Sequence, residues 1–186
     1  KNNYGVVEDH PELLDANYDH GNLQDWTHIN AVDYNADLDQ ILISSRSMSE
    51  IYIIDHSTTL AEAASHSGGN AGKGGDFLWR WGNPLVYRQG VVADQKLFGQ
   101  HNAEWVENSY CHDGKISVFN NGGDGTNTHS SVHTIEPQFN GLYNYTITSS
   151  TFEPISFSTS WNGNVMGQVM YTGKKGGVKS LPNGGY

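Results

Sequence analysis

Short runs of β-branched and aromatic residues, separated by turn-forming residues, recur along most of this chain. Residues 27–34, 40–45, 50–55 and 77–81 read THINAVDY, QILISS, EIYIID and FLWRW, and they predict four β-strands. The links between the first three strands, NADLD and RSMS, are hairpin-sized, which predicts antiparallel neighbours. Between the third and fourth strands, TTLAEAASH predicts one or two helical turns with a threonine N-cap, and SGGNAGKGG predicts a loop.

A second group of strands follows in a similar order. QHNAEWV (100–106), KISVFN (115–120), SVHTIE (131–136) and YNYTIT (143–148) predict four more strands. Each group opens with a histidine near the start of its first strand, His28 in THIN and His101 in QHNA. The second strand of each group ends in polar residues, with Arg46 after one and Asn121 after the other. We therefore interpret the chain as two repeats of one four-stranded unit.

Repeated four-stranded antiparallel units are typical of an all-β fold of the β-propeller class. We expect one blade at about 25–88, a second at about 98–150 and the start of a further blade at about 152–186, where VKSLPNGGY reads as an opening strand. Two to three blades do not close a ring, so we expect the chain to be part of a single propeller domain of a longer protein. A β-sandwich is the competing architecture, because it too is built from hairpins at regular spacing.

The amino-acid composition limits which classes of partner and binding site the chain can have. Lys and Arg total 10 against 20 Asp and Glu, a formal net charge of −10, which argues against nucleic acid or an anionic membrane. The sequence has no apolar run long enough to span a membrane. It has one cysteine, Cys111, which excludes a disulfide within the chain and a cysteine-based zinc site, and we expect a buried or half-buried thiol there.

The candidate chemistry lies at the strand starts. In a propeller the first strand of each blade lines the central channel, so His28 and His101 would face the same volume, with Arg46 at the same rim. Two imidazoles and a guanidinium would form a pocket for an oxyanion such as sulfate, phosphate or carboxylate. A neutral histidine can act as nucleophile while the other donates a hydrogen bond or moves a proton.

The sequence gives weaker support for other kinds of binding or catalytic site. His129 and His133 stand four apart where a loop enters a strand, which does not place them on one helical face, and we expect no metal. DYNADLD lacks the glycine and closing glutamate of a calcium loop, GKGGD lacks the context of a phosphate loop, and no GxSxG motif occurs. We expect the tryptophans Trp79, Trp81 and Trp105 to pack in the core or between blades.

The quoted segments carry a family resemblance. DWTHINAVDYNADLDQILISSR, EIYIIDHSTT, GKGGDFLWRWGNP, DQKLFGQHNAEWV and ISVFNNG resemble the bacterial arylsulfate sulfotransferases over nearly all of the chain. The specific parts are D-W-x-H-x-N, S-S-R and Q-H-x-A. The resemblance implies a six-bladed propeller, a periplasmic or secreted protein, no cofactor, and small aryl sulfate and phenol substrates.

The resemblance also implies roles for residues. His101 of Q-H-x-A would be the nucleophile that carries the sulfuryl group, His28 of D-W-x-H would assist the sulfuryl group and the leaving oxygen, and Arg46 of S-S-R would hold sulfate oxygens. Arg46, His28 and Asn30 would together bind substrate. A further substrate-binding histidine of the family has no counterpart that can be mapped here.

Two other functions stay open at this point. One is a non-catalytic extracellular propeller that binds a ligand or assembles with other copies, in which loops such as SHSGGNAGKGGD would matter most. The other is a metal-dependent hydrolase with histidine and carboxylate ligands. In any propeller, the missing blades or other chains, further copies of this chain among them, would have to close the ring.

Overall fold

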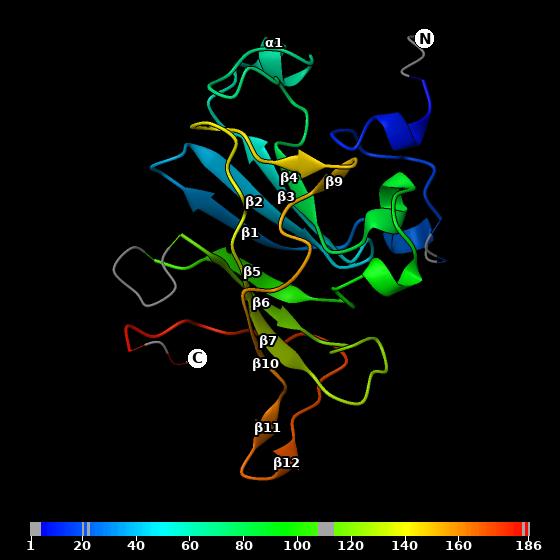
Figure 1. Ribbon diagram of the computed structural model, residues 1–186, viewed down its shortest axis with the longest axis vertical. Coiled ribbons are helices and arrows are strands. Elements are labelled where there is room, and N and C mark those ends of the chain that lie inside the picture. The colour runs from blue at the N-terminus through cyan, green and yellow to red at the C-terminus, as the bar shows by residue number, and fades with distance from the viewer. Residues whose placement is uncertain (1–4, 20, 22, 108–113, 184, 186) are drawn as a thin grey trace.

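The fold is seen in a computed structural model, which describes residues 5–19, 21, 23–107, 114–183 and 185. The chain is all-β with antiparallel sheets and almost no helix (Figure 1). Its helical elements are short: η1 (Val7–Asp9), η2 (Leu23–Asp25), α1 (Leu60–Ala63), η3 (Pro84–Tyr87) and η4 (Val92–Asp94). Cys111, expected to be a buried or half-buried thiol, falls outside the described residues.

The first sheet follows the predicted order. It runs β1-β2-β3-β4, and every neighbouring pair is antiparallel. The strands are β1 (Ile29–Asn35), β2 (Gln40–Ser45), β3 (Glu50–Asp55) and β4 (Trp79–Trp81). The helical turn predicted between β3 and β4 is α1, and Thr59 caps it in a capping box with Glu62, as its sequence indicates.

The second sheet differs from the prediction at its fourth strand. Its order is β5-β6-β7-β10, with β5 (His101–Trp105), β6 (Ile116–Asn120), β7 (Ser131–Ile135) and β10 (Thr159–Trp161). The prediction that residues 143–148 form the fourth strand was wrong, and the sheet draws on residues beyond the expected end of the second unit near residue 150. Two small hairpins complete the strands, namely β8 (Ile147–Thr148) with β9 (Thr151–Phe152) and β11 (Asn164–Val165) with β12 (Gln168–Val169). Val178–Ser180, expected to open a third unit, forms no strand.

Residues 136–158, here called the connecting segment, leave β7 and cross the first sheet before returning to β10 (Figure 1). The Trp79 indole N–H donates to the Glu153 carbonyl at 2.8 Å, and the Trp81 indole donates to the carbonyl of Pro154. Gln40 donates to the Tyr143 carbonyl at 3.0 Å and accepts from the Tyr145 hydroxyl. The residues predicted to add an edge strand therefore serve to tie the two sheets together.

The main core lies between the sheets. Apolar side chains from β2, β3 and β4 meet those from β5, β6 and β7, with Tyr145 and Phe152 of the connecting segment closing the cluster. Trp79 and Trp81 are buried in it and Trp105 packs against it, which confirms the structural role predicted for the tryptophans. Burial of this apolar surface is the main favourable contribution to the stability of the fold.

A buried ion pair connects the first sheet to the N-terminal segment. Arg80 and Glu50 are both fully buried, and the Arg80 Nε donates to Glu50 Oε1 at 2.9 Å. The same guanidinium donates to the carbonyls of Pro11 and Leu13 and lies 4.3 Å from the ring centre of Tyr87. These contacts fasten the N-terminal segment to the sheet.

The first strands of the two sheets lie side by side. The Asn30 side chain of β1 donates to the Gln100 carbonyl at 2.7 Å, and Asp33 accepts from the Trp105 backbone N–H at 2.7 Å. Both strands carry a register shift near their start, between Ile29 and Ala31 in β1 and between His101 and Glu104 in β5. Bulges of this kind re-aim side chains and are frequent beside functional sites.

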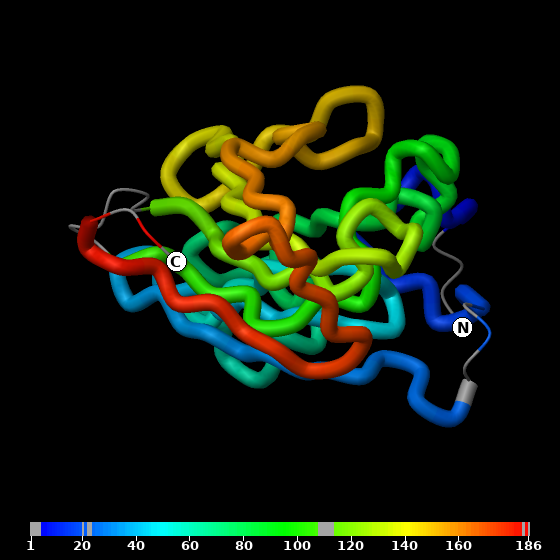
Figure 2. The backbone as a smooth tube through the Cα atoms, turned by 90° about the horizontal axis from the view of Figure 1, so that it is seen from below, coloured from blue at the N-terminus to red at the C-terminus, as the bar shows by residue number. Residues whose placement is uncertain are grey.

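Figure 2 shows the C-terminal segment, in red, and the connecting segment, in yellow and orange, on opposite sides of the sheets. The C-terminal segment reaches β5 at Val178, whose backbone N–H donates to the Asn102 side chain at 2.6 Å. The loop just before it, around Thr172 and Lys175, also contacts the residue that follows β6. This segment therefore forms one wall beside the start of β5.

Candidate functional site

His28 immediately precedes β1, in a backbone conformation that is uncommon for residues other than glycine. Its φ is +43°, and its carbonyl accepts from the Arg46 backbone N–H at 3.0 Å. Its Nδ1 forms a hydrogen bond with the carboxylate of Asp25. Left-handed conformations at residues other than glycine cost free energy and concentrate at functional sites. The backbone thus fixes His28 opposite Arg46, as the sequence predicted for the two strand ends.

His101 is the first residue of β5 and is partly buried. Its ring centre lies 6.5 Å from that of His28, with the ring planes at 78°. Its Nδ1 lies 2.7 Å from Oδ1 of Asn121 and 3.2 Å from the carbonyl oxygen of Gly99. The prediction that the two histidines lie close together is therefore confirmed by the geometry.

Arg46 follows β2 and places its guanidinium over Gly99. A Cβ built on Gly99 would lie 3.8 Å from Nη2 of Arg46, and Gly99 itself has a φ of +65°, a conformation that favours glycine. Within the described part of the chain, no carboxylate forms an ion pair with this guanidinium. A half-buried, uncompensated guanidinium that lies over Gly99, two residues before His101, is suited to hold an oxyanion.

Asn30 and Gln100 fix the approach of the two strands. Gln100 is fully buried, and its amide lies within hydrogen-bond distance of the Ser44 hydroxyl and the carbonyls of Ser45 and Glu50. Asn30 in turn holds the Gln100 carbonyl. The residue before His101 is therefore anchored from both sides, which explains why a glutamine precedes the histidine and a serine stands at position 44.

Three of the four predicted residues line two neighbouring hollows, and His28 lines neither of them. His101 and Asn30 line one of about 350 Å³, together with Glu104 and Lys175. Arg46 lines the other, of about 310 Å³, together with Gly99 and Asn121. The hydrogen bond between His101 and Asn121 connects the two linings. The sequence predicted a single pocket for these residues. The structure places Asn30 and His101 at one hollow and Arg46 at the other, while His28 lies 6.5 Å from His101 between ring centres and lines neither hollow.

Three further residues at this site received no role from the sequence. Asp25 contacts His28, Asn121 contacts His101, and Lys175 lines the hollow beside His101. Asp25 belongs to the D-W-x-H pattern, which was the available signal. Asn121 was noted only as a polar strand end, and nothing in the sequence indicates that a residue 20 positions after His101 contacts its ring.

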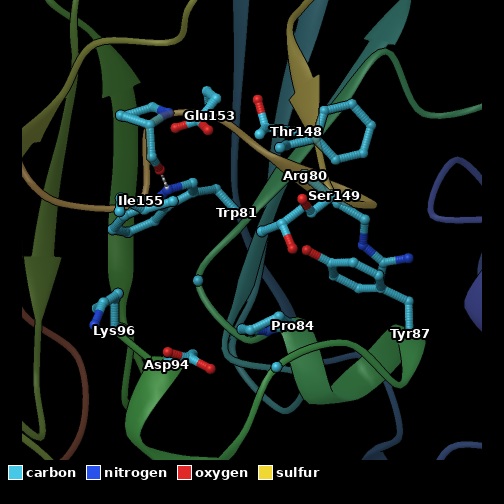
Figure 3. A pocket seen from close by; sticks show the side chains of 15 residues that line it. Arg80, Trp81, Pro84, Tyr87, Asp94, Lys96, Thr148, Ser149, Glu153 and Ile155 are labelled. Carbon is cyan, nitrogen blue, oxygen red and sulfur yellow. Dashed lines mark hydrogen bonds between the residues drawn. The ribbon is translucent and has the colours of Figure 1, made fainter.

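A cavity larger than these two hollows lies at the other edge of the first sheet, away from these residues. It has a volume of about 440 Å³ and is enclosed by β4, the 3₁₀ turns after it and the β8–β9 hairpin (Figure 3). Trp81, Tyr87 and Ile155 contribute apolar surface, and Asp94 and Lys96 lie at its border (Figure 3). None of His28, Asn30, Arg46 or His101 lines it.

Two further findings concern metals and membranes. Among the described residues, no group of three or more His, Cys, Asp or Glu side chains is placed to hold a metal ion. In the same part of the chain, no helix has the length and apolar character needed to cross a membrane.

Comparison with known proteins identifies the family. No curated protein matches the chain closely. The model of the family described as Arylsulfotransferase (ASST), however, matches residues 3–184, which is nearly the whole chain and includes every residue of the site. The resemblance seen in the sequence is confirmed, and the chain belongs to the arylsulfotransferase family.

Proposed function

We propose that this chain carries part of the active site of an aryl sulfotransferase, with His101 as the covalent carrier of the sulfuryl group. The observation that supports it most is the distance of 6.5 Å between the ring centres of His101 and His28, together with the Arg46 guanidinium, which lies over Gly99 and has no counter-ion among the described residues. Membership of the family supports the reaction class. A net charge of −10 makes a local cationic pocket necessary for an anionic donor.

The reaction has two displacements at sulfur. In the first, an imidazole nitrogen lone pair of His101 forms an N–S bond while the S–O bond to the aryl group breaks, and the aryl oxygen leaves with the electron pair. In the second, a phenol oxygen forms a new S–O bond, the N–S electron pair returns to the imidazole, and the phenol proton passes to a base. No oxidant, reductant or cofactor enters this balance.

The surrounding residues would stabilise and move charge. Sulfuryl transfer resembles phosphoryl transfer in leaving negative charge on peripheral and leaving oxygens. Arg46 would hold the sulfate oxygens, and one such preorganised donor is worth about 3 kcal/mol of barrier. Since the Asp25 carboxylate only accepts, Nδ1 of His28 carries a proton, which leaves Nε2 to exchange a proton with the phenol oxygens.

Asn30 would contribute to substrate binding through its side-chain oxygen, which forms no hydrogen bond with the described part of the chain. Its Nδ2 is occupied by the Gln100 carbonyl, whereas its Oδ1 is buried without a partner among the described residues. An amide oxygen accepts hydrogen bonds, so it suits the hydroxyl of the incoming phenol better than the sulfate oxygens, which are themselves acceptors.

For this function we interpret the two sheets as adjacent blades of a propeller. Two observations support the interpretation: each sheet is a four-stranded antiparallel unit, and the first strands of the two sheets lie side by side. In the complete protein we propose six blades around a channel lined by β1 and β5, closed by blades or chains beyond the residues described here, in a periplasmic or secreted location.

The test is a trapped intermediate in the protein as it is naturally produced. After brief mixing with 4-nitrophenyl sulfate, intact-mass spectrometry should show an adduct of roughly 80 Da, the mass of one sulfuryl group, together with nitrophenol release. His101→Ala should abolish both. His56→Ala is the matched control, because His56 is an exposed histidine bonded to Asp39 at the opposite end of β2 and β3 from Arg46, and it should behave like the wild type.

Adduct formation on the His101→Ala variant would contradict the assignment of the nucleophile. Absence of adduct and of nitrophenol release from the wild type, over a panel of aryl sulfates, would contradict the proposed reaction itself.

A further inference from the structure

Asn121 is the one side chain in hydrogen-bond contact with the His101 ring among the described residues. It directly follows β6, is almost fully buried, and lies 20 positions from the histidine in sequence. Its location, between the hollow of His101 and that of Arg46, prompts the question of what its amide does for the imidazole.

The orientation of the Asn121 amide follows from its other partners. Its Nδ2 donates to the backbone carbonyls of Thr172, at 2.8 Å, and of Lys175. Turning the amide over would place Oδ1 against two carbonyl oxygens, neither of which has a proton to donate. The Asn121 Oδ1 therefore faces His101 and can only accept.

The second neighbour of Nδ1 of His101 leads to the same conclusion about the proton on this nitrogen. The Gly99 carbonyl oxygen lies 3.2 Å from Nδ1 of His101, and it too can only accept. With two acceptors and no donor beside it, Nδ1 must carry a proton. The structure records no hydrogen bond to Nε2 from any described residue, so that nitrogen keeps its lone pair.

We infer that Asn121 is a positioning residue that fixes His101 with its proton on Nδ1, so that Nε2 is the atom that attacks sulfur. When the Nε2–S bond forms, the ring gains positive charge, and the Nδ1–H bonds to Asn121 and Gly99 strengthen accordingly. When the bond breaks, the electron pair returns to Nε2 and Nδ1 keeps its proton throughout. The kinetic part of this inference rests on the proposed function, whereas the protonation of the ring does not.

The hydrogen bonds of Asn121 also connect the His101 ring to a distant loop. Both donors of its amide are bound to the loop that leads into the C-terminal segment, and Lys175 of that loop lines the His101 hollow. The protonation pattern of the imidazole is thus coupled to the position of a loop that reaches the site from elsewhere in the chain.

The first measurement is the tautomer itself. In protein labelled with ¹⁵N-histidine, long-range ¹H–¹⁵N spectra at mildly alkaline pH distinguish the protonated from the unprotonated nitrogen of each neutral ring. The chain has 9 histidines, so His101 is assigned by its absence from a His101→Gln variant. We expect Nδ1–H in the wild type and a mixture of tautomers in Asn121→Leu. Nε2–H in the wild type would overturn the inference.

The second measurement separates positioning from simple structural support. Asn121→Asp keeps an acceptor for Nδ1–H but sets a carboxylate against two carbonyls, so a merely structural role predicts that it is worse than Asn121→Leu. A positioning role predicts the reverse. Asn121→Leu should slow adduct formation about 10- to 100-fold at unchanged KM for the donor, and Asn121→Asp should recover most of the rate.

The matched control is Asn120→Leu. Asn120 is equally buried, but its amide bonds only to the backbone of Lys96, Phe98 and Gly123, so its loss should lower stability and leave the His101 tautomer unchanged. If His101→Ala abolishes the adduct while Asn121→Leu forms it at the wild-type rate, the inference fails and the proposed function stands. If the wild type forms no adduct at all, the proposed function fails and the spectra still decide the tautomer.

Discussion

Replacing Arg80 by methionine tests how the buried ion pair holds the first sheet. Arg80 and Glu50 have no exposed surface, and burial raises the pKa of Glu50 while the Arg80 guanidinium opposes that rise. The substitution leaves a buried carboxylate with the Tyr52 hydroxyl as its remaining side-chain partner. It also removes the donors to the carbonyls of Pro11 and Leu13.

The magnitude follows from these losses. Removing one partner of a buried pair costs about 3–5 kcal/mol of unfolding free energy, because the remaining charge is uncompensated. Each backbone carbonyl that loses its donor adds about 1 kcal/mol unless water reaches it. Without Arg80, the folded-state pKa of Glu50 rises further above its unfolded value. A raised pKa favours folding at low pH, so the stability deficit of the variant should grow as the pH rises.

Urea unfolding followed by tryptophan fluorescence measures these effects at several pH values. The double variant Glu50→Gln/Arg80→Met removes the charge as well, and should recover most of the loss and all of its pH dependence. Lys115→Met is the control for a partly exposed pair with Glu136, worth about 0–1 kcal/mol. An Arg80→Met variant that loses under about 1 kcal/mol, or a double variant as unstable as the single one, would refute this account of the pair.

Two further predictions concern a buried histidine and a buried glutamine. Burial, with a smaller contribution from His129, lowers the pKa of His133 from 6.5 to about 4, so the unfolded chain binds the proton more readily. Stability should therefore fall as the pH drops from 6.5 toward 4, by about 2 kcal/mol at pH 4.5 relative to pH 7, and His133→Gln should lack this part of the acid loss in urea titrations. Gln100→Leu leaves the partners of its amide unsatisfied and should cost about 1–3 kcal/mol, with slower sulfuryl transfer because His101 is displaced. Wild-type stability and rate in this variant would contradict the anchoring role.

The parts of the fold that are local in sequence could be predicted. The first three strands are joined by hairpin-sized turns, so the alternation of apolar residues and the turn NADLD were sufficient to place them. Trp79 and Trp81 were correctly predicted to pack inside. The fourth strand of the second sheet could not be predicted, because YNYTIT has the composition of a strand but Tyr145 is buried against Gln40 of the first sheet. Strand propensity does not specify the partner.

Of the contacts in the candidate site, some could be predicted from the sequence and others could not. The approach of His28 to His101 was predictable, because both stand at the start of the first strand of a repeated unit. The contact between His101 and Asn121 was not, because it depends on the strand bulge and on a loop more than 50 residues further along the chain. Asp25 stood within a quoted pattern, but its carboxylate gained a role only once the turn before β1 was seen.

The connecting segment has a consequence for the order in which the chain folds. Its contacts with the first sheet join residues 74 positions apart, at Trp79 and Glu153, and 105 positions apart, at Gln40 and Tyr145. Closing such long loops is entropically costly and slows folding. During synthesis, the second sheet must wait for β10 at Thr159–Trp161, which emerges after the segment that crosses its neighbour. The two sheets should therefore acquire their final protection from hydrogen exchange together, as a single cooperative unit.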